Sequence, residues 1–277
     1  MSHLELTVLG GGNMGRALIG GLLRHGMRPE QIAVGESYEA ARTTLSRELG
    51  IAATADNAAA IRKADVVVLA VKPQDAQSVL APLSAQLQQR RPVVLSIVAG
   101  VRVQALQRWC GDGVPVIRAM PNRPALAGAG ATGLFAPAEI DASGRAAAAQ
   151  IMQSVGEIVW VETEEALDVV TALSGSGPAY FFLLAEAMAK AGVDLGLTED
   201  TARRLSIATL HGAGLLAQGS DGDLARLRAE VTSKGGTTEA ALRTLQAADF
   251  NELISRAVTA ATLRSRELAE QAAVPSR

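Results

Sequence analysis

Three glycines near the start of the chain have the spacing Gly-x-Gly-x-x-Gly: Gly10, Gly12 and Gly15. They stand within residues 4–23, between an apolar, strand-like stretch and a helical pattern. In such a fingerprint the first glycine permits a tight turn, the second lets backbone approach a pyrophosphate, and the third lets the helix pack on the strand. Free N–H groups at the helix start, Asn13 to Arg16, favour a bound anion. Glycine triplets also occur in ordinary turns, but the strand before and the helix after favour a phosphate site.

A carboxylate, Glu36, follows the next predicted strand, Gln31 to Gly35. Dinucleotide folds recognise the adenosine ribose at this place, about 20 residues beyond the glycines. A carboxylate there would accept hydrogen bonds from the ribose hydroxyls and would repel a 2′-phosphate, which favours NAD over NADP. The alternative is that Ser37 caps the following helix and Glu36 is solvated.

Two loops in the second half of the chain combine glycines with hydroxyl side chains. One is Ser174-Gly175-Ser176-Gly177-Pro178, and the other is Thr232-Ser233-Lys234-Gly235-Gly236-Thr237-Thr238. Ser176 suits an N-cap and Pro178 a first helical turn. Backbone N–H and hydroxyl donors in the second loop could converge on an anion, although either loop alone could be a plain connection. Their occurrence together, behind a nucleotide-type fold, favours a binding site.

Groups that other reaction classes require are missing. None of His3, His25 and His211 lies in a cluster with metal-ligand spacing, and no Ser-His-Asp set or carboxylate pair is indicated, so no metal site and no hydrolysis are predicted. A carbonyl reductase needs a positioned acid such as His or Lys. An imine nitrogen is basic enough to arrive protonated, so hydroxyl-rich loops fit hydride transfer to an imine better.

The elements that position these groups alternate in the first half of the chain. Apolar runs of buried parallel-strand type alternate with helical patterns, which predicts a doubly wound sheet. The predicted strands are Gln31–Gly35, Asp65–Val71, Pro92–Ala99, Val114–Ala119 and Glu157–Val161, with a further strand within Leu126–Phe135 and a short segment at Ile51–Thr54. The predicted helices end at Leu49, begin at Asn57, and cover Val103–Trp109 and Ala138–Val155.

From about Thr163 strand-like runs give way to helical periodicity. We expect two domains: residues 1–162 form a dinucleotide-binding Rossmann domain, and residues 163–277 form an all-helical domain. In the second, Gly192 is expected to end the first helix, Thr198 to cap a helix that reaches Gln218, and a short helix to end near Val231. The fold class is therefore α/β, with a Rossmann-type doubly wound sheet followed by helices.

Composition excludes several partners. The chain has 277 residues, a formal net charge of −2 and 26 basic residues that are scattered, so nucleic acid and anionic membranes are not expected partners. The lone Cys110 permits no internal disulfide, and no signal peptide precedes the first strand, which favours the cytoplasm. Charged residues and Gln interrupt each helical pattern, so no membrane-spanning helix is expected.

Together these residues resemble the pyrroline-5-carboxylate reductase family over nearly the whole chain. The resemblance rests on Gly10–Gly15, Ala70-Val71-Lys72-Pro73-Gln74, Met120-Pro121-Asn122, Leu173-Ser174-Gly175-Ser176-Gly177-Pro178-Ala179-Tyr180 and Val231-Thr232-Ser233-Lys234-Gly235-Gly236-Thr237-Thr238. It implies reduction of the C=N bond of 1-pyrroline-5-carboxylate to L-proline, the last step of proline biosynthesis, with NADPH or NADH. It also implies an obligate homodimer with intertwined helical domains, and some members assemble five dimers into a decamer.

The motif and the resemblance together assign roles to individual residues. The cofactor-binding residues are Gly10, Gly11, Gly12, Asn13, Met14, Gly15, Glu36, Ser37, Asn57, Ala70, Val71, Lys72, Pro73 and Asn122. The substrate-binding residues are Ser176, Pro178, Ser233, Gly235, Gly236, Thr237 and Thr238. The resemblance implies that backbone amides and hydroxyls of the second loop hold the substrate carboxylate. It also implies that the Thr238 hydroxyl is the catalytic group and forms a hydrogen bond with the imine nitrogen. From position alone, Pro73 could instead simply stop a strand, with Lys72 solvated.

The chain departs from the family pattern in two places. Many bacterial members carry Asn-Arg after the second strand, where the arginine holds the 2′-phosphate of NADP, whereas this chain has Glu36-Ser37. With Arg42 nearby, we expect both nucleotides to be used and NADH to be unusually competent. The other departure is Arg123, where Thr is usual; it could attract the anionic substrate or be solvated.

Two other functions remain open from the sequence. A 3-hydroxyacid dehydrogenase of similar architecture would need a helical lysine as proton donor in the second domain, and Lys190 is the candidate. A non-catalytic redox sensor would bind dinucleotide without turnover, which the intact substrate loops disfavour.

Overall fold

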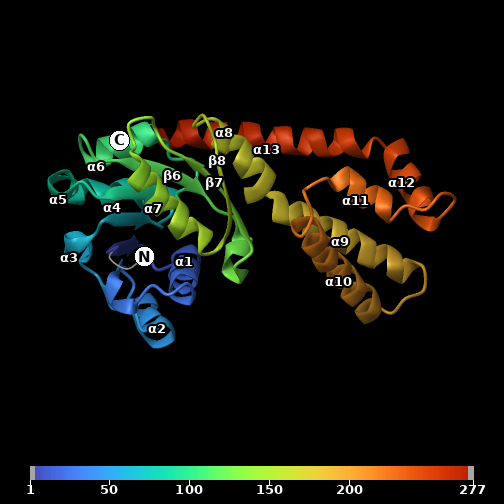
Figure 1. Cartoon of the computed structure of the whole chain (residues 1–277), viewed down its shortest axis with the longest axis horizontal. Helices are drawn as coiled ribbons and strands as arrows, with labels where there is room; N and C mark the ends of the chain where they lie inside the picture. Colours follow the sequence, from blue (N-terminus) through green and yellow to red (C-terminus); the bar gives the residue numbers. More distant parts are fainter. Residues whose placement is uncertain (1–3, 274–277) are drawn as a thin grey trace. The chain divides into compact units, whose positions relative to one another are not determined.

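The fold was analysed in a computed structural model, which describes residues 4–273 (Figure 1). The strands are β1 (Leu6–Leu9), β2 (Ile32–Gly35), β3 (Ala53–Thr54), β4 (Val66–Leu69), β5 (Val93–Ser96), β6 (Val116–Met120), β7 (Gly130–Phe135) and β8 (Gly156–Trp160). The helices of the first half are α1 (Asn13–Arg24), α2 (Glu39–Leu49), α3 (Asn57–Ala60), α4 (Ala76–Leu80), α5 (Ser84–Arg90), α6 (Val103–Cys110) and α7 (Ala142–Gln153). Then follow α8 (Ala166–Val170), a π-helical turn (Thr171–Gly175), α9 (Gly177–Asp194), α10 (Glu199–Gln218), α11 (Leu224–Glu230), α12 (Thr237–Ala247) and α13 (Phe250–Ala273).

The strands form one sheet in the order β3-β2-β1-β4-β5-β6-β7-β8. All neighbours are parallel except β6 and β7, which are antiparallel. The chain moves outward from β1 to β3 and then crosses to β4 on the other side of β1, so the strand order reverses between β1 and β4. Open α/β sheets bind ligands at the carboxyl ends of the strands beside such a reversal. The loops after Leu9, Gly35 and Leu69 therefore meet at one edge, because these residues pair in register.

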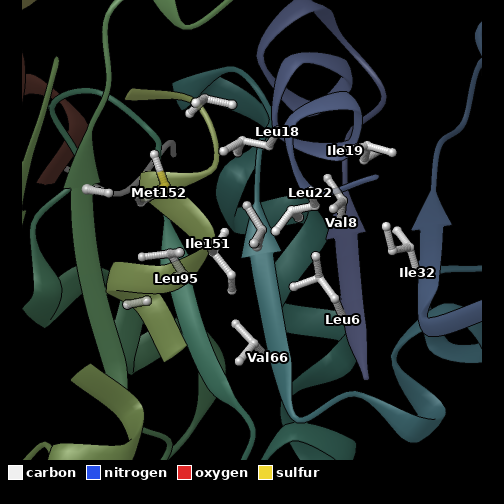
Figure 2. Close-up of a cluster of buried hydrophobic side chains, with 14 of the residues drawn as sticks. Leu6, Val8, Leu18, Ile19, Leu22, Ile32, Val66, Leu95, Ile151 and Met152 are labelled. Atoms are coloured by element: carbon white, nitrogen blue, oxygen red, sulfur yellow. The ribbon is translucent and has the colours of Figure 1, made fainter. Parts of the chain in front are cut away.

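Alternate residues of each strand point to opposite sides of the sheet, so each face carries its own apolar side chains. Helices cover both faces. On one face, Leu6 and Val8 of β1 pack with Leu18 and Leu22 of α1 and with Ile151 of α7 (Figure 2). On the other face a second cluster joins strand residues to α4, α5 and α6; its members include Leu9, Val67, Leu69, Leu80, Leu87 and Leu106. The doubly wound fold class is confirmed.

Most predicted elements form at the expected places, and three local expectations are wrong. Gly192 lies inside α9, and that helix continues to Asp194, ahead of Gly196 with φ +106°. The helix expected from Ala138 begins at Ala142, because the Asp141 side chain accepts the Gly144 N–H at 2.7 Å and caps it there. Ser37 does not cap α2, since that helix begins at Glu39.

Buried ionic groups attach the end of α13 to the sheet domain. Asp168 is 2% exposed and accepts a hydrogen bond from Arg102 Nη2 at 2.6 Å and another from Ser265 Oγ of α13 at 2.8 Å. Beside it, Arg118 pairs with Glu164 at 2.7 Å. Burial lowers the pKa of the Arg118 guanidinium, and the hydrogen bond and charge of Glu164 oppose that shift. The last described turns of α13 therefore pack with the sheet.

The described residues form two compact units. One comprises residues 4–175 together with 261–273, and the other is Ser176–Ala260. The expected boundary after residue 162 is a sequence-based prediction that differs from this division in two respects: α8 packs on β7, and the end of α13 returns to the first unit. The placement of the functional boundary at 162/163 stays a prediction.

The second unit exposes a large apolar surface. Phe181, Phe182 and Leu183 of α9 are 58%, 61% and 66% exposed, and Leu215 and Leu216 of α10 are 56% and 65% exposed. A helix that is apolar all round is normally covered by another element. The helical stretch Ala166–Asp194 is also long and apolar enough to cross a membrane by length and composition, so the expectation that charges interrupt every such stretch is wrong. An apolar surface of this kind fits association with another protein chain.

Candidate active site

The glycine-rich loop has the conformation expected of a phosphate cradle. Gly10 has φ +106°, and a Cβ atom there would lie 2.4 Å from the Ala70 carbonyl oxygen, so only glycine fits. Its N–H donates to Gly35 O at 2.8 Å, which joins the loop to β2. A Cβ on Gly15 would lie 2.2 Å from the Gly10 carbonyl oxygen. Helix α1 therefore begins pressed against the loop, as the fingerprint predicts.

Gly12 differs from both of these glycines. A Cβ there would meet nothing within 4 Å, so the space over it is open in the chain itself. Gly12 is the N-cap of α1, no side chain caps the helix, and the first intrahelical bond runs from Arg16 N to Gly12 O at 2.9 Å. The N–H groups of Asn13, Met14 and Gly15 thus lack intrahelical partners and face the helix start. Open space, free donors and the positive end of a helix dipole fit a pyrophosphate.

Glu36 lies at the carboxyl end of β2 and is 9% exposed. Its Oε2 accepts the Gly11 N–H at 2.7 Å, and its Oε1 accepts the Tyr38 N–H at 2.8 Å. The carboxylate is therefore oriented against the glycine-rich loop and is not solvated. Each oxygen has a second lone pair, which leaves it able to accept a ribose hydroxyl. The ribose role of Glu36 stays a prediction, and this orientation is compatible with it.

The surroundings of Glu36 include one cation that the structure holds in place. Arg42 is half-buried and donates from Nη1 to the carbonyl oxygens of Glu36 at 2.9 Å and Ser37 at 2.7 Å. Ser37 itself is exposed. A guanidinium fixed on these carbonyls offsets part of the Glu36 charge. The chain therefore presents both an acidic and a basic group at the place where a 2′-phosphate would distinguish NADP from NAD.

The remaining predicted cofactor contacts lie at neighbouring strand ends. The Asn57 side chain lies against Gly35, since a Cβ on that glycine would be 2.2 Å from Asn57 Oδ1. Ala70 and Val71 follow β4 and are half-buried. Lys72 and Pro73 are exposed, and Lys72 precedes a 3-10 turn that Pro73 opens. The predicted contacts after β1, β2, β3 and β4 are thus at one edge of the sheet.

Asn122 has a different environment from the other predicted contacts. It is 8% exposed, its Nδ2 donates to Ser174 O at 3.0 Å, and its Oδ1 accepts the Ala131 N–H at 2.9 Å. These bonds clamp the end of β6 to the start of β7 and to the π-helical turn. Its contact with a cofactor stays a prediction. Neighbouring Arg123 is exposed, and among the described residues its guanidinium makes no ion pair.

The second hydroxyl-rich loop, between α11 and α12, is partly closed by its own hydrogen bonds. Gly235 has φ +75° and donates its N–H to Glu239 Oε2 at 2.6 Å, and Gly236 donates its N–H to Ser233 O at 3.0 Å. Both glycine N–H groups therefore have partners within the loop, and their contact with a substrate carboxylate stays a prediction. The free donors are instead the N–H groups of the first helical residues, Thr237 and Thr238, which have no intrahelical partner.

The hydroxyl groups of this loop remain available for a ligand. Ser233 and Thr237 are exposed, Thr238 is half-buried, and none of their hydroxyls donates a hydrogen bond among the described residues. Ser176 and Pro178 occupy the N-cap position and the first turn of α9 as expected, but Ser176 makes no capping bond. No hydrogen bond or ion pair within the described residues joins Ser176 or Pro178 to the α11–α12 loop.

The structure also bears on the alternative proton donor. Lys190 is on α9, its side chain is 73% exposed, and its Nζ pairs with Asp194 at 2.8 Å one turn away. An exposed i,i+4 ion pair is an ordinary feature of a helix surface. Within residues 4–273 no three His, Cys, Asp or Glu side chains form a group that could hold a metal ion; His3 lies outside the described residues.

Sequence reasoning missed two residues at these sites. Tyr38 follows the predicted ribose residue and is 76% exposed, and Glu239 bonds the loop glycine from the third position of α12. The signal for Glu239 was present, because Gly-Thr-Thr-Glu has the spacing at which an N3 glutamate reaches back to the helix start. The signal for Tyr38 is only its place directly after Glu36-Ser37.

Comparison with known proteins links both halves of the chain to one family. The family described as pyrroline-5-carboxylate reductase dimerisation matches residues 164–268, and that described as NADP oxidoreductase, coenzyme F420-dependent, matches residues 5–100. A curated pyrroline-5-carboxylate reductase of Pseudomonas aeruginosa is 44% identical over 98% of this chain and 99% of its own length. One from Vibrio alginolyticus is 39% identical over 97% and 98%.

Solved structures agree over the same length. A pyrroline-5-carboxylate reductase from Coxiella burnetii superposes with a TM-score of 0.93 at 40% identity, covering 96% of this chain and 98% of that one. The Plasmodium falciparum pyrroline carboxylate reductase, solved with NADP bound, superposes with a TM-score of 0.82 at 27% identity, covering 97% and 99%. Similarity thus extends through both the sheet and the helical part.

Proposed function

The chain belongs to the pyrroline-5-carboxylate reductase family, and we propose how its residues divide the work of that reaction. The protein is an oxidoreductase that reduces the C=N bond of 1-pyrroline-5-carboxylate to L-proline, the last step of proline biosynthesis. When bound, NAD(P)H supplies the hydride for this reduction. The observation that carries the residue assignment is the presence of a dinucleotide cradle at Gly10–Gly15 and of an anion-accepting helix start at Thr237–Thr238 in the same chain.

The cofactor is assigned to the carboxyl edge of the sheet. The free N–H groups at the start of α1 hold the pyrophosphate over Gly12, where the chain leaves open space. Glu36 accepts hydrogen bonds from the adenosine ribose, and Asn57 contacts the same half from α3. Ala70, with the residues up to Pro73, lines the nicotinamide side. The fit is supported by Gly10, whose backbone could not accommodate a Cβ without leaving the loop conformation.

The substrate carboxylate is assigned to the start of α12. Because Gly235 and Gly236 use their N–H groups within the loop, the donors are the N–H groups of Thr237 and Thr238 and the hydroxyls of Ser233 and Thr237. The positive end of the α12 dipole favours the anion there. Ser176 and Pro178 are assigned to the pocket wall. This differs from amide binding by the two glycines and follows from their internal hydrogen bonds.

Thr238 is assigned the contact with the imine nitrogen. A protonated imine needs no strong acid. A hydroxyl that is hydrogen-bonded to the nitrogen can orient the C=N carbon for hydride attack and can stabilise the nitrogen while its positive charge is lost. The Thr238 hydroxyl has no internal acceptor among the described hydrogen bonds, so it is free for this role. The chain therefore supplies orientation and electrostatics rather than an acid of its own.

Assembly and cellular place complete the proposal. The chain carries the dimerisation domain of the family and forms a homo-oligomer, for which the exposed apolar residues of α9 and α10 provide the surface. A homodimer that further associates into a pentamer of dimers is our proposal. We also propose a domain boundary at 162/163, a cytoplasmic location, and the absence of nucleic-acid or membrane partners. The net charge of −2 supports the absence of such partners.

The test is oxidation of NADH and of NADPH by the purified protein in the presence of 1-pyrroline-5-carboxylate. We expect turnover with both nucleotides, with NADH unusually competent because Glu36-Ser37 stands where the family resemblance leads one to expect Asn-Arg. No turnover with either nucleotide would overturn the function. A kcat/KM for NADPH a hundredfold above that for NADH would overturn the role of Glu36 while leaving the function intact.

A further inference from the structure

Tyr38 is a highly exposed aromatic side chain at the edge where the cofactor is assigned. The residue is 76% exposed although it follows a buried strand and a buried carboxylate. Its hydroxyl and ring take no part in the hydrophobic clusters of the first unit. An aromatic ring in water at the end of β2 is therefore a surface that the fold itself does not use.

The backbone of Tyr38 is fixed relative to the phosphate cradle. A single carboxylate, that of Glu36, accepts the Gly11 N–H at 2.7 Å through one oxygen and the Tyr38 N–H at 2.8 Å through the other. The glycine-rich loop, the predicted ribose residue and Tyr38 are thus joined by consecutive hydrogen bonds. From the pyrophosphate outward, a bound dinucleotide would meet Glu36 first and then Tyr38, whose N–H donates to Glu36 Oε1.

Asn57 lies beside the end of β2, on the side opposite to the Glu36 side chain. Successive residues of a strand point to opposite faces, and Asn57 Oδ1 lies where a Cβ of Gly35 would be, whereas the Glu36 side chain points to the glycine-rich loop. Tyr38 is the N-cap of α2 and Asn57 is the first residue of α3, so both residues follow strands that end at this edge of the sheet.

We propose that the Tyr38 ring is the stacking wall for the adenine of the dinucleotide, so that it sets how tightly the adenosine half is held. This inference rests on the proposed function, since it takes the cofactor to lie at Gly10–Gly15. Tyr38 is a binding residue remote from the reacting atoms, and it acts on affinity rather than on chemistry. It also acts independently of the 2′-phosphate, which is distinguished by Glu36 and Arg42.

The test compares three probes on the full-length protein by isothermal titration calorimetry: NADH, ADP-ribose, and reduced nicotinamide mononucleotide, which lacks adenosine. Loss of one stacking face weakens binding of a base by a factor that we place at about five- to tenfold. Tyr38→Ala should weaken NADH and ADP-ribose by this same factor and leave the mononucleotide unchanged. Tyr38→Phe keeps the ring, so its affinity for NADH should stay within about twofold of that of the wild-type protein.

Two further readouts separate this role from a structural one. Because the Tyr38 side chain is exposed and the hydrogen bonds of this residue are made by its backbone N–H and carbonyl oxygen, Tyr38→Ala should leave the melting temperature and kcat at saturating NADH unchanged. It should weaken NADPH as much as NADH, whereas Glu36→Gln should shift the ratio of the two toward NADPH. An unchanged affinity for ADP-ribose, or an equal loss for the mononucleotide, would overturn the adenine wall. Those results would leave turnover of the unchanged protein, and hence the proposed function, intact; failure of the unchanged protein to bind NADH would overturn both.

Discussion

Gly10 and Gly12 stand two residues apart in the same loop, yet alanine should affect them in opposite ways. At Gly10 the φ of +106° excludes an ordinary L-residue, and the new Cβ would lie 2.4 Å from the Ala70 carbonyl oxygen. At Gly12 the φ is −69° and a Cβ meets nothing within 4 Å. The first substitution should therefore damage the fold, and the second should damage only what binds over the loop.

The magnitudes follow from these geometries. For Gly10→Ala, a left-handed conformation costs about 1–2 kcal/mol and a backbone shift to relieve the overlap about 1–3 kcal/mol, so we expect a loss of about 2–5 kcal/mol in the free energy of unfolding. That corresponds to a fall of roughly 5 °C or more in Tm. For Gly12→Ala, alanine is a poorer N-cap than glycine by about 0.5–1 kcal/mol, and the lower conformational entropy of alanine in the unfolded chain offsets most of that loss, so Tm should stay within about 2 °C.

The affinity for the cofactor should depend directly on Gly12, and on Gly10 only through damage to the fold. A methyl group at Gly12 would occupy the space assigned to the pyrophosphate, and an overpacked contact of about 1–3 kcal/mol weakens binding roughly 5- to 150-fold. Scanning calorimetry of the cofactor-free proteins and titration with NADH would measure both effects. A Gly12→Ala protein that binds NADH normally would refute the pyrophosphate assignment, and a Gly10→Ala protein as stable as the parent would refute the steric reasoning.

Three more outcomes follow from the structure. Thr238→Ala should lower kcat roughly 10- to 100-fold as one transition-state hydrogen bond is lost, and an unchanged kcat would remove Thr238 from the mechanism. Cys110 is fully buried, and burial raises its pKa to about 12, so the folded thiol should resist alkylation. The free energy of unfolding should fall between about pH 9 and 12, because over this range only the unfolded thiol ionises. Cys110→Ala should remove the contribution of this thiol to that fall. Asp168→Ala should lower the free energy of unfolding by about 3–5 kcal/mol, because it strands Arg102 without its buried partner, and a denaturation midpoint equal to that of the parent would contradict this.

Local sequence patterns were sufficient for the sheet and its ligand edge. Runs such as Val66–Leu69 are apolar on both faces, which only a covered parallel strand requires. The glycine spacing predicted the loop conformation, because Gly10 and Gly15 each leave no room for a Cβ atom while the space over Gly12 is open. Thr198 likewise capped α10 as expected, since its side chain accepts the Thr201 N–H locally. The Thr198 cap and the approach of Gly15 to Gly10 are contacts between residues close together in the chain.

Features that depend on distant contacts were not predictable in the same way. The return of the α13 end to the first unit is set by partners such as Asp168 and Ser265, which are 97 residues apart in the chain. The internal bond from Gly235 to Glu239 was within reach of sequence reasoning but competed with the more obvious anion site. The apolar stretch within α9 shows the same limit, because its composition alone does not say what covers it.

Product analysis tests the central claim most directly. The purified protein would be incubated with 1-pyrroline-5-carboxylate and NADH or NADPH, and L-proline would be quantified against the nucleotide oxidised. We predict equal amounts of L-proline formed and nucleotide oxidised, and no oxidation when the pyrroline is omitted. Oxidation without proline, or no oxidation with either nucleotide, would contradict the account.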